Sequence, residues 1–483
     1  MSIKYFTLFL LSLVLLFSSC EDDEERFANN PPDTFFSIKE INLSGDNRLN
    51  SIVRLSWYGT DTDGYIKGYE ISLDGQQWSF TTTQDSTFRF NLTQGSDTTD
   101  IQVFVRAIDN NNERDPSPDE LTIPIKNTAP VASFDKDLTI PDTAYLVATT
   151  AWKATDLDGD ESITKVSISI NGKKWYELNK SKPTISIVAP TNATSDTVDA
   201  LIYYESENTP QAIRVEGLVL NDTNKIYLKA EDQAGTESLI DTSTTFFMKG
   251  KTNDILVVGG VEVAHDDYKT IFNNAGITYD FINMTANGGE NQPKLWNITF
   301  RLQLLQYSKL FFYSDEAGYI NPFSNVKSIL LEFAAASLQE YANLGGKYLV
   351  STSFDHDTNI DGFIGVLPIA SVSAKDYGDA RFYGDSVGTS SLNDFPEISP
   401  TGFAILGTGV FNIDSADTEV IYEAALSDRR RTIPWPDTEI IASGRRVNGK
   451  LNQVFFSVQL FELNGDQQAL QDLFNQIFNV EFQ

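Results

Sequence analysis

An internal repeat in the first half of the chain most limits what it can fold into. Residues 53–80 read VRLSWYGTDTDGYIKGYEISLDGQQWSF, and residues 149–178 read TTAWKATDLDGDESITKVSISINGKKWYEL. Each segment has a tryptophan four residues before an aspartate, and an Asp-Gly or Asn-Gly pair whose glycine stands three residues before a second tryptophan. Such pairs between runs of alternating polarity predict β-hairpins. The repeat therefore predicts two similar β domains in tandem.

Later stretches of the two repeats also correspond. Residues 101–113 (IQVFVRAIDNNNE) and 226–237 (IYLKAEDQAGTE) alternate apolar and polar residues and then break into a polar loop. One face of each strand can therefore be buried. Together with the early tryptophans, the Ala-x-Asp strand ends resemble tandem fibronectin type III or immunoglobulin-like domains. The resemblance implies all-β sandwiches at residues 33–127 and 128–250, used as spacers or binding platforms.

The first twenty residues predict export and a lipid anchor. Residues 5–17 are almost wholly apolar and follow Lys4, as in a signal peptide, and the run is too short to span a membrane. Two serines then precede Cys20, the only cysteine of the chain. This segment resembles the lipobox of bacterial lipoproteins, which implies a signal peptide at residues 1–19 and a membrane lipid anchor, palmitate included, on Cys20. The alternative is an ordinary cleaved signal peptide.

A run of acids follows the cysteine. Residues 21–25 are all acidic, and the segment 20–32 ends in two asparagines and two prolines. Such a run usually forms a solvated tether, and here it also resembles the export signal of Gram-negative lipoproteins displayed on the outer face of the outer membrane. We therefore predict a lipid-anchored, surface-exposed location in the outer membrane, with a periplasm-facing anchor as the alternative.

Composition excludes one class of partner. The chain has 36 basic and 67 acidic residues and a formal net charge of −31, so nucleic acid, which needs clustered basic residues, is not an expected partner. With its one cysteine lipidated the chain can form no disulfide. We expect its stability to come from hydrophobic cores.

After residue 250 the pattern changes to alternating strands and helices. Apolar runs predict buried strands at residues 254–260, 279–284, 308–314 and 347–353. Helical spacing predicts helices at residues 267–277, 325–346 and 466–479. A strand pair is expected within 438–463, around Asn448-Gly449. Residues 251–483 are therefore expected to form an α/β open sheet with helices on both faces, which makes the chain multidomain.

This half resembles the class I glutamine-amidotransferase-like, flavodoxin-related fold. The stretches ILVVGG, LGGKYLVSTS and VFFSVQLF carry the resemblance. Enzymes of that family place a cysteine in the turn after a strand and a histidine on a late strand. Here the turn has Ser351 and Ser353, and the late strand has Gln459 in a stretch without histidine. The resemblance thus implies a degenerate domain without the family's catalytic residues.

Two serines and two histidines remain weak catalytic candidates. A serine nucleophile needs a base within hydrogen-bond reach, and the only histidines are His265 and His356. A Ser353–His356 pair or a Ser351–His265 pair is conceivable. An extracellular serine- or metal-dependent hydrolase is therefore the alternative to a non-enzymatic role.

Two acidic stretches are candidate calcium sites, because clustered oxygens suit that cation; no other cofactor is expected. The first comprises Asp156, Asp158, Asp160 and Glu161, and the second comprises Asp355, Asp357, Asn359 and Asp361. The second matches the start of a calcium loop, although Pro368 stands where a glutamate is required. For both, the alternative is that the residues only form turns.

The sequence therefore predicts a non-enzymatic cell-surface lipoprotein that binds or scaffolds within an outer-membrane complex, with an outer-membrane protein as partner. A second alternative is a glycan-binding lipoprotein. Glycan binding would need exposed aromatic residues, for which Trp296, Trp435 and Tyr319 are candidates.

Overall fold

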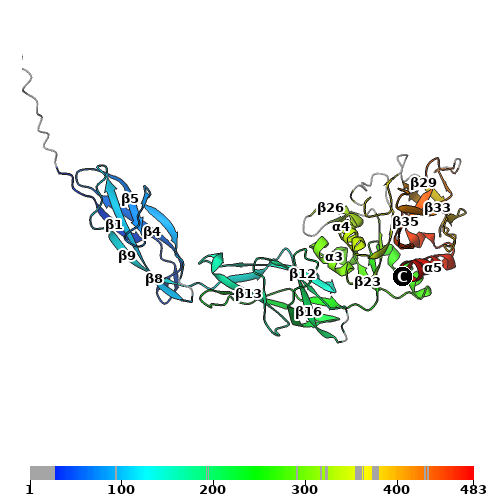
Figure 1. Cartoon of the computed structure of the whole chain (residues 1–483), viewed down its shortest axis with the longest axis horizontal. Helices are drawn as coiled ribbons and strands as arrows, with labels where there is room; N and C mark the ends of the chain where they lie inside the picture. Colours follow the sequence, from blue (N-terminus) through cyan, green and yellow to red (C-terminus); the bar gives the residue numbers. More distant parts are fainter. Residues whose placement is uncertain are drawn as a thin grey trace, which may run out of the picture. The chain divides into compact units, whose positions relative to one another are not determined.

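The computed structural model describes residues 28–92, 95–191, 193, 195–289, 292–315, 318–320, 325–353, 362, 364–372, 380–428, 431 and 434–483. They divide into two compact units (Figure 1). The first extends to Ala129 and includes the loops Asp156–Ser162 and Gln233–Thr236; the second comprises the remainder. Among the described residues, no helix combines the length and the hydropathy that a membrane crossing requires.

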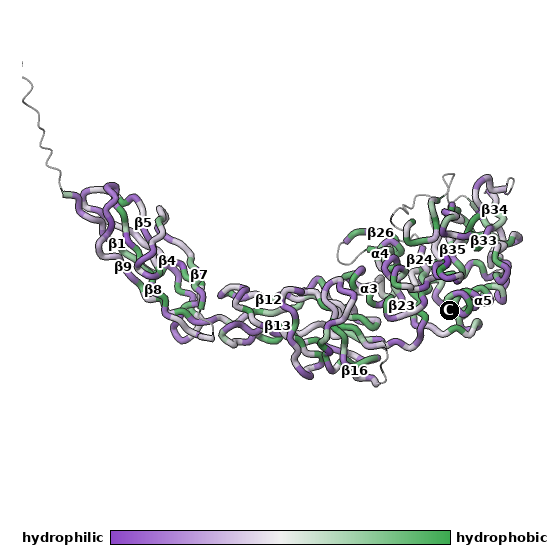
Figure 2. Tube along the Cα trace, viewed as in Figure 1, coloured by the Kyte–Doolittle hydropathy of each residue, from purple (hydrophilic) through white to green (hydrophobic). Residues whose placement is uncertain are grey.

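The first unit is built on a β-sandwich of two mainly antiparallel sheets. One sheet has the order β1-β4-β7, with β1 at Asp33–Ile38, β4 at Ile52–Thr60 and β7 at Asp85–Arg89. The other has the order β2-β3-β9-β8-β5-β6, with strands at Leu43–Gly45, Arg48–Leu49, Asp119–Lys126, Thr98–Asp109, Ile66–Ser72 and Ser79–Thr81. Hydrophobic and hydrophilic residues alternate along these strands (Figure 2), so one face of each sheet packs inward. The repeat tryptophan Trp57 lies in this core and donates through Nε1 to the Thr83 carbonyl at 2.8 Å.

The second β-sandwich repeats this plan in the second unit. Its sheets have the orders β10-β12-β15-β16-β17, β14-β13-β19-β20 and β11-β21-β18. The strands lie at Val131–Phe134, Val147–Thr155, Thr184–Val188, Thr197–Tyr204, Arg214–Val219, Tyr176–Leu178, Ile163–Ile170, Ile226–Asp232, Asp241–Thr242, Thr143–Tyr145, Phe246–Lys249 and Asp222–Asn224. Trp152 is buried in β12 as Trp57 is in β4. Between β13 and β14, Asn171 and Gly172 have φ of 52° and 68° in a β-turn that the Lys173 N–H closes on the Ile170 carbonyl at 3.1 Å, and positive φ at both central residues is typical of a type I′ turn. The tandem β-sandwiches expected from the repeat are present.

The second sandwich also differs from the first. Strands β16 and β17 extend the sheet that contains β12, whereas the corresponding sheet of the first sandwich has only three strands. The extension creates a wider sheet face. The sequence repeat gave no indication of this addition.

Five parallel strands form the centre of the remaining part. They lie in the order β23-β22-β24-β27-β36, followed by the antiparallel strands β35, β33 and β30. Their bounds are Asp280–Asn283, Ile255–Gly259, Lys309–Ser314, Lys347–Thr352, Lys450–Phe456, Ile440–Val447, Thr418–Ala424 and Gly388–Ser390. The smaller pairings in this part involve β25 (Gly318–Ile320), β26 (Lys327–Ile329), β28 (Ser371–Val372), β29 (Ala380–Tyr383), β31 (Ala404–Thr408), β32 (Phe411–Asn412) and β34 (Leu426–Ser427).

Helices cover both faces of the parallel strands. Side chains that alternate along β24 enter different cores, with Phe311 on one side and Phe312 on the other. Helices α2 (His265–Asn274) and α5 (Gln467–Asn475) pack on the Phe311 side. Helices α3 (Trp296–Leu304) and α4 (Leu330–Asn343) pack on the Phe312 side. The sequence did not predict α3, and α4 begins five residues later than expected, after β26.

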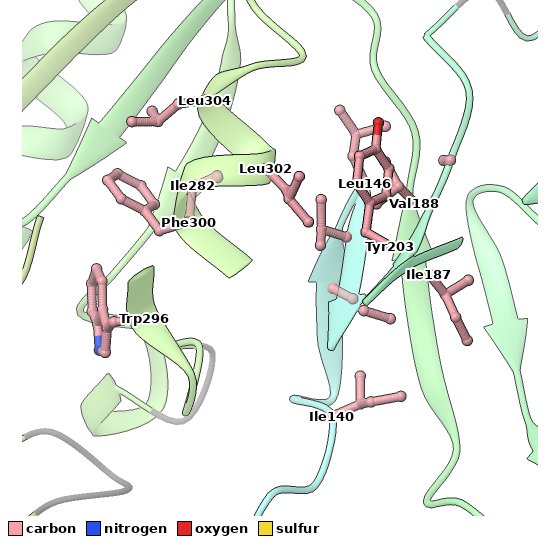
Figure 3. Close-up of a cluster of buried hydrophobic side chains, with 14 of the residues drawn as sticks. Ile140, Leu146, Ile187, Val188, Tyr203, Ile282, Trp296, Phe300, Leu302 and Leu304 are labelled. Carbon is pink, nitrogen blue, oxygen red and sulfur yellow. The ribbon is translucent and has the colours of Figure 1, made fainter. Parts of the chain in front are cut away.

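Helix α3 is buried on two sides. On one side Trp296 and Phe300 pack against the rings of Phe333 and Phe312. On the other side Leu302 lies next to Leu146 and Val188 of the second sandwich (Figure 3). The second sandwich before residue 250 and the α/β part after it therefore differ in topology but share one hydrophobic core.

Polar contacts also hold α3 against the second sandwich. Thr299 donates through Oγ1 to Thr149 Oγ1 at 2.8 Å inside the core. The Arg301 guanidinium, with only 5% of its side chain exposed, donates to the carbonyls of Ser206 (2.9 Å) and Glu207 (3.0 Å) and lies 3.3 Å from Glu340 Oε1. A buried cation with this many acceptors is well compensated.

Asp280 fixes the start of β23 to the chain that leaves the second sandwich. Its carboxylate accepts hydrogen bonds from the Thr252 backbone N–H at 2.8 Å, from Tyr307 Oη at 2.9 Å and from Asn253 Nδ2 at 3.0 Å. Burial acts to raise the pKa of Asp280, but these donors outweigh it and hold the pKa below its usual value.

We predict that Arg301→Ala destabilises the second unit by about 3–5 kcal/mol, because it leaves Glu340 and two carbonyls without their donor. Urea unfolding followed by tryptophan fluorescence measures this change. The control Arg214→Ala removes an exposed arginine whose side chain, among the described residues, bonds only the Gln211 carbonyl, at 3.3 Å, and is expected to cost less than about 0.5 kcal/mol. Equal effects of the two variants would contradict the prediction.

A second prediction concerns acid stability. Because the folded pKa of Asp280 is lowered, its stabilising contribution is full above the unfolded value of about 4 and is lost as the pH falls through the folded value. The wild-type protein should therefore exceed Asp280→Asn in unfolding free energy at about pH 7, and the difference should shrink below about pH 4. Urea titrations of both proteins across this range test it. A difference that is independent of pH would show that the ionised carboxylate is not responsible.

Candidate functional site at the carboxyl ends of the parallel strands

Open α/β sheets bind their ligands beyond the carboxyl ends of the parallel strands. Of two pockets among the described residues, the first reaches this edge only at its His265 end and extends to Asn253 and Tyr279 before β22 and β23, whereas the second lies at this edge. The first, here called the His265 pocket, has a volume of about 580 Å³ and lies along α2. The second, here called the Gln459 pocket, has a volume of about 440 Å³ and adjoins the ends of β27 and β36.

The His265 ring is held from both sides. Its Nδ1 lies 2.7 Å from Tyr313 Oη, and its Nε2 lies 3.1 Å from Asn283 Oδ1 and 3.2 Å from Thr285 Oγ1. Asn283 Oδ1 already accepts from the backbone N–H groups of Thr285 and Ala286, so it is placed to accept from His265 Nε2–H as well. In that tautomer Nδ1 accepts from Tyr313 Oη. A Cβ on Gly259 would lie 2.6 Å from Tyr313 Oη and 2.8 Å from His265 Cε1. Glycine at the end of β22 is therefore needed for this close packing.

The Ser351 hydroxyl forms hydrogen bonds with backbone groups. It is fully buried, donates through Oγ to the Val458 carbonyl at 3.0 Å and accepts from the Leu460 N–H at 3.0 Å. Tyr268 Oη lies 3.4 Å from the same Oγ. Within the described residues, Ser351 and His265 thus have separate partners. The conceivable Ser351–His265 pair is not formed, because each group is already used to join neighbouring elements.

The Gln459 pocket collects polar groups from three strand ends. Ser353 follows β27, Gln459 follows β36, and Asp315 follows β24, and all three line the pocket. Gln459 Nε2 donates to the Ser314 carbonyl and lies 3.5 Å from Ser353 Oγ. Glu462 also lines the pocket, and burial raises the pKa of its carboxyl group. Sequence reasoning noted Gln459 only as a missing histidine and did not identify Glu462, which lies in a short 3-10 turn beyond the end of β36 and has no sequence signal of its own.

Several predicted site residues lie outside the described residues. They are Cys20, His356, Asp355, Asp357, Asn359 and Asp361. The lipid anchor, the Ser353–His356 pair and the second calcium loop therefore stay predictions.

The first acidic stretch forms a turn. The Asp156 carboxylate accepts from the Asp158 N–H at 2.9 Å and from Ser162 Oγ at 2.6 Å. Asp158 accepts from the Thr128 N–H at 2.8 Å, and Asp160 accepts from the Asp156 N–H at 2.9 Å. Glu161 lies in the same short 3-10 turn as Asp160. In the part of the chain that the structure describes, no group of three or more His, Cys, Asp or Glu is placed to hold a metal ion. The geometry favours the turn over a calcium site here.

The aromatic candidates for glycan binding are used inside the protein. Trp296 and Trp435 are 4% and 9% exposed and belong to the two cores of the second unit. Tyr319 donates through its hydroxyl to the Gly260 carbonyl. The tryptophans therefore do not form the exposed platform that a glycan would need.

The chain was compared with known proteins. No protein-family model matches it, and neither does any curated protein sequence. Among solved structures, the PKD1 domain of the Vibrio cholerae metalloprotease PrtV is 18% identical and covers 20% of this chain and 99% of its own, with a TM-score of 0.15. Fibronectin(III)-like modules of Clostridium thermocellum CbhA are 13% identical, and the match covers 45% of this chain and 95% of theirs, with a TM-score of 0.16. A two-domain fibronectin type III segment of chicken tenascin is 11% identical, and the match covers 44% of this chain and 98% of that segment, with a TM-score of 0.22. With scores this low, the fold rests on this chain's own strand pairing.

We predict that Ser351→Ala destabilises the second unit by about 1–3 kcal/mol, because it leaves the Leu460 N–H and the Val458 carbonyl unpaired in the core. Chemical denaturation measures the loss. Ser415→Ala, at an exposed serine, is the control and should change stability by less than about 0.5 kcal/mol. A Ser351→Ala protein with unchanged stability would reopen the possibility that this serine has a chemical role.

Proposed function

We propose that this chain is a non-enzymatic, lipid-anchored protein of the outer-membrane surface that binds a protein partner as a component of a complex. In this proposal Cys20 carries the lipid and residues 20–32 form the acidic tether. The multiple acyl chains of such an anchor hold a protein firmly without a membrane-spanning helix. The β-sandwiches act as spacers, and the α/β part presents the binding surface.

The observation that carries the non-enzymatic role is the use of two strand-end hydroxyl groups. Ser351 at the end of β27 donates to the Val458 carbonyl, and Ser457, directly after β36, donates to the Gly409 carbonyl and lies 3.3 Å from the Ile441 carbonyl. A nucleophilic hydroxyl needs a base as its hydrogen-bond partner. These two instead join backbone segments.

The strand order supports kinship of the α/β part with amidotransferase-like domains. Numbered along the chain, the five parallel strands run 2-1-3-4-5, which is the flavodoxin-like order. In this proposal, serines and Gln459 correspond to the family's cysteine and histidine, as the sequence resemblance implies. We therefore propose a degenerate member of that fold, kept for binding.

The test is affinity purification of the tagged full-length chain from detergent-solubilised membranes, with mass spectrometry of what accompanies it. We expect a stoichiometric outer-membrane partner and an acylated N-terminal peptide. A Cys20→Ala chain is the matched control and should leave the membrane fraction. Purification of the anchored chain alone, in several detergents, would contradict the scaffold role.

A further inference from the structure

The two sandwiches differ at one sheet edge. In the first sandwich β7 ends the three-stranded sheet, whereas in the second sandwich the corresponding strand, β15, is followed by β16 and β17. The correspondence is exact in the backbone pairing. The Trp57 N–H donates to the Gln84 carbonyl at 2.9 Å, and the Trp152 N–H donates to the Pro183 carbonyl at 3.0 Å. Strand β7 therefore occupies the place of β15 but lacks the neighbour that β15 has.

The backbone of β7 is paired on one side only among the described residues. Antiparallel strands direct the backbone groups of alternate residues to opposite sides. The Gln84 carbonyl and the Phe90 N–H bond to the segment around β4. The backbone groups of Asp85, Thr87 and Arg89 therefore point away from β4, and no other strand of the described chain pairs with them. These groups form what is here called the β7 edge.

Strand β16 shows what fills the corresponding edge of the second sandwich. The Glu205 N–H donates to the Thr184 carbonyl at 3.0 Å, and the antiparallel pairing continues along β15 as far as Val188. Alternate side chains of β16 are buried in the core, namely Val198, Ala200, Ile202 and Tyr204. An antiparallel strand with apolar residues at alternate positions therefore completes this edge.

A groove follows the β7 edge in the first sandwich. It consists of two pockets, of about 440 and 670 Å³, and Leu73 lines both. Phe88 lines the first pocket and Phe90 lines the second. These two residues alternate along the strand direction, so the pockets are spaced as the side chains on one face of an extended strand are. Leu73 and Phe80, which also line the groove, are 56% and 54% exposed. The groove thus offers apolar surface to the kind of side chains that β16 supplies in the second sandwich.

The charges near the β7 edge favour an acidic strand. Strands β4 and β7 have two arginines and one aspartate, Arg54, Arg89 and Asp85. Asp85 is already paired with Lys39 and with Arg54. Arg89 is exposed and has no ion pair among the described residues. A second copy of this chain would bring the same excess of positive charge to the edge, whereas an acidic segment would compensate it.

We propose that the β7 edge binds an extended segment of another protein as a fourth, antiparallel strand. The segment has apolar residues at alternate positions, which enter the two pockets, and an acidic residue on its outer face near Arg89. Backbone hydrogen bonds to Asp85, Thr87 and Arg89 supply affinity, and the pockets supply specificity, as in other cases of strand addition. This inference goes beyond the proposed function, in which the first sandwich is only a spacer.

The test uses a fluorescently labelled peptide with the sequence of β16 and its flanks, DTVDALIYYE (residues 196–205). It alternates apolar residues and has three acidic residues. The full chain in detergent micelles already has its own β16 on β15, which leaves the β7 edge for the peptide. We expect saturable binding by fluorescence anisotropy, measured against empty micelles.

Two N-methylated peptides are matched controls. The Ile202 carbonyl accepts from the Gln211 N–H on the side away from β15, so the backbone groups of Leu201 and Tyr203 face β15. Methylation of the Leu201 and Tyr203 amides removes two donors to the edge and should weaken binding by about tenfold or more. Methylation of the Ile202 amide alone should leave binding nearly unchanged.

Two variants at one position of the protein test the edge itself. Thr87→Pro removes an N–H that points out of the sheet, a change that an edge strand tolerates, and should weaken binding by about tenfold or more. Thr87→Val keeps the N–H and a β-branched side chain and should bind as the wild type does. The proposal is overturned if the wild-type chain does not bind the peptide, or if Thr87→Pro binds it equally well.

Sedimentation of the full chain in detergent tests the identity of the occupant. A chain that stays monomeric supports a segment of another protein. Self-association that Thr87→Pro abolishes would identify a second copy instead and overturn that assignment. If the peptide does not bind but the full chain still co-purifies with a membrane partner, this inference fails while the proposed function stands.

Discussion

The packing of α3 against two different sheets is the interaction on which the second unit depends. The helix buries Trp296 and Phe300 toward the parallel strands and Leu302 toward the second sandwich. Arg301 then ties the loop between β16 and β17 to α4. Apolar burial supplies most of the favourable free energy of such a junction, and the buried cation fixes its geometry because a displaced guanidinium would lose its acceptors. Helix α3 itself packs on β12 and β15, and the added strands contribute through the loop between β16 and β17, which supplies acceptors for Arg301.

Local sequence signals predicted the parts of the fold that local interactions decide. The Asn448-Gly449 pair has φ of 53° and 82° and joins β35 to β36, because a two-residue hairpin requires positive φ at both positions. The apolar run at 254–260 became β22, buried on both faces. Helix α3 was not predicted from the sequence because it is also buried on both faces. Its buried residues include Thr299, Leu302 and Leu304. Such a helix lacks the one-sided apolar stripe from which helices are recognised.

In the candidate site, too, local sequence predicted some features, and contacts between distant parts of the chain decided the others. The sequence placed Ser351 and Ser353 in the turn after a buried strand and Gln459 on a late strand. The structure has Ser351 near the end of β27, Ser353 directly after that strand, and Gln459 beyond the end of β36. Which hydroxyl groups are already engaged depended on elements more than a hundred residues apart, as the Ser351–Leu460 bond shows. Glu462 enters the pocket through a short 3-10 turn that has no sequence signature of its own. The role of a side chain cannot be predicted from the spacing of residues in the sequence when its hydrogen-bond partners lie in distant parts of the chain.

The acidity of the chain matters most where a carboxyl group is partly buried. With 67 acidic and 36 basic residues, many carboxylates must lack a cation, and on the surface water solvates them at little cost. Glu462 differs because it is partly withdrawn from water, and burial raises its pKa. Ionisation of this group therefore opposes folding, unlike ionisation of the exposed carboxyl groups. It lies at the carboxyl ends of the parallel strands, where α/β folds bind their ligands.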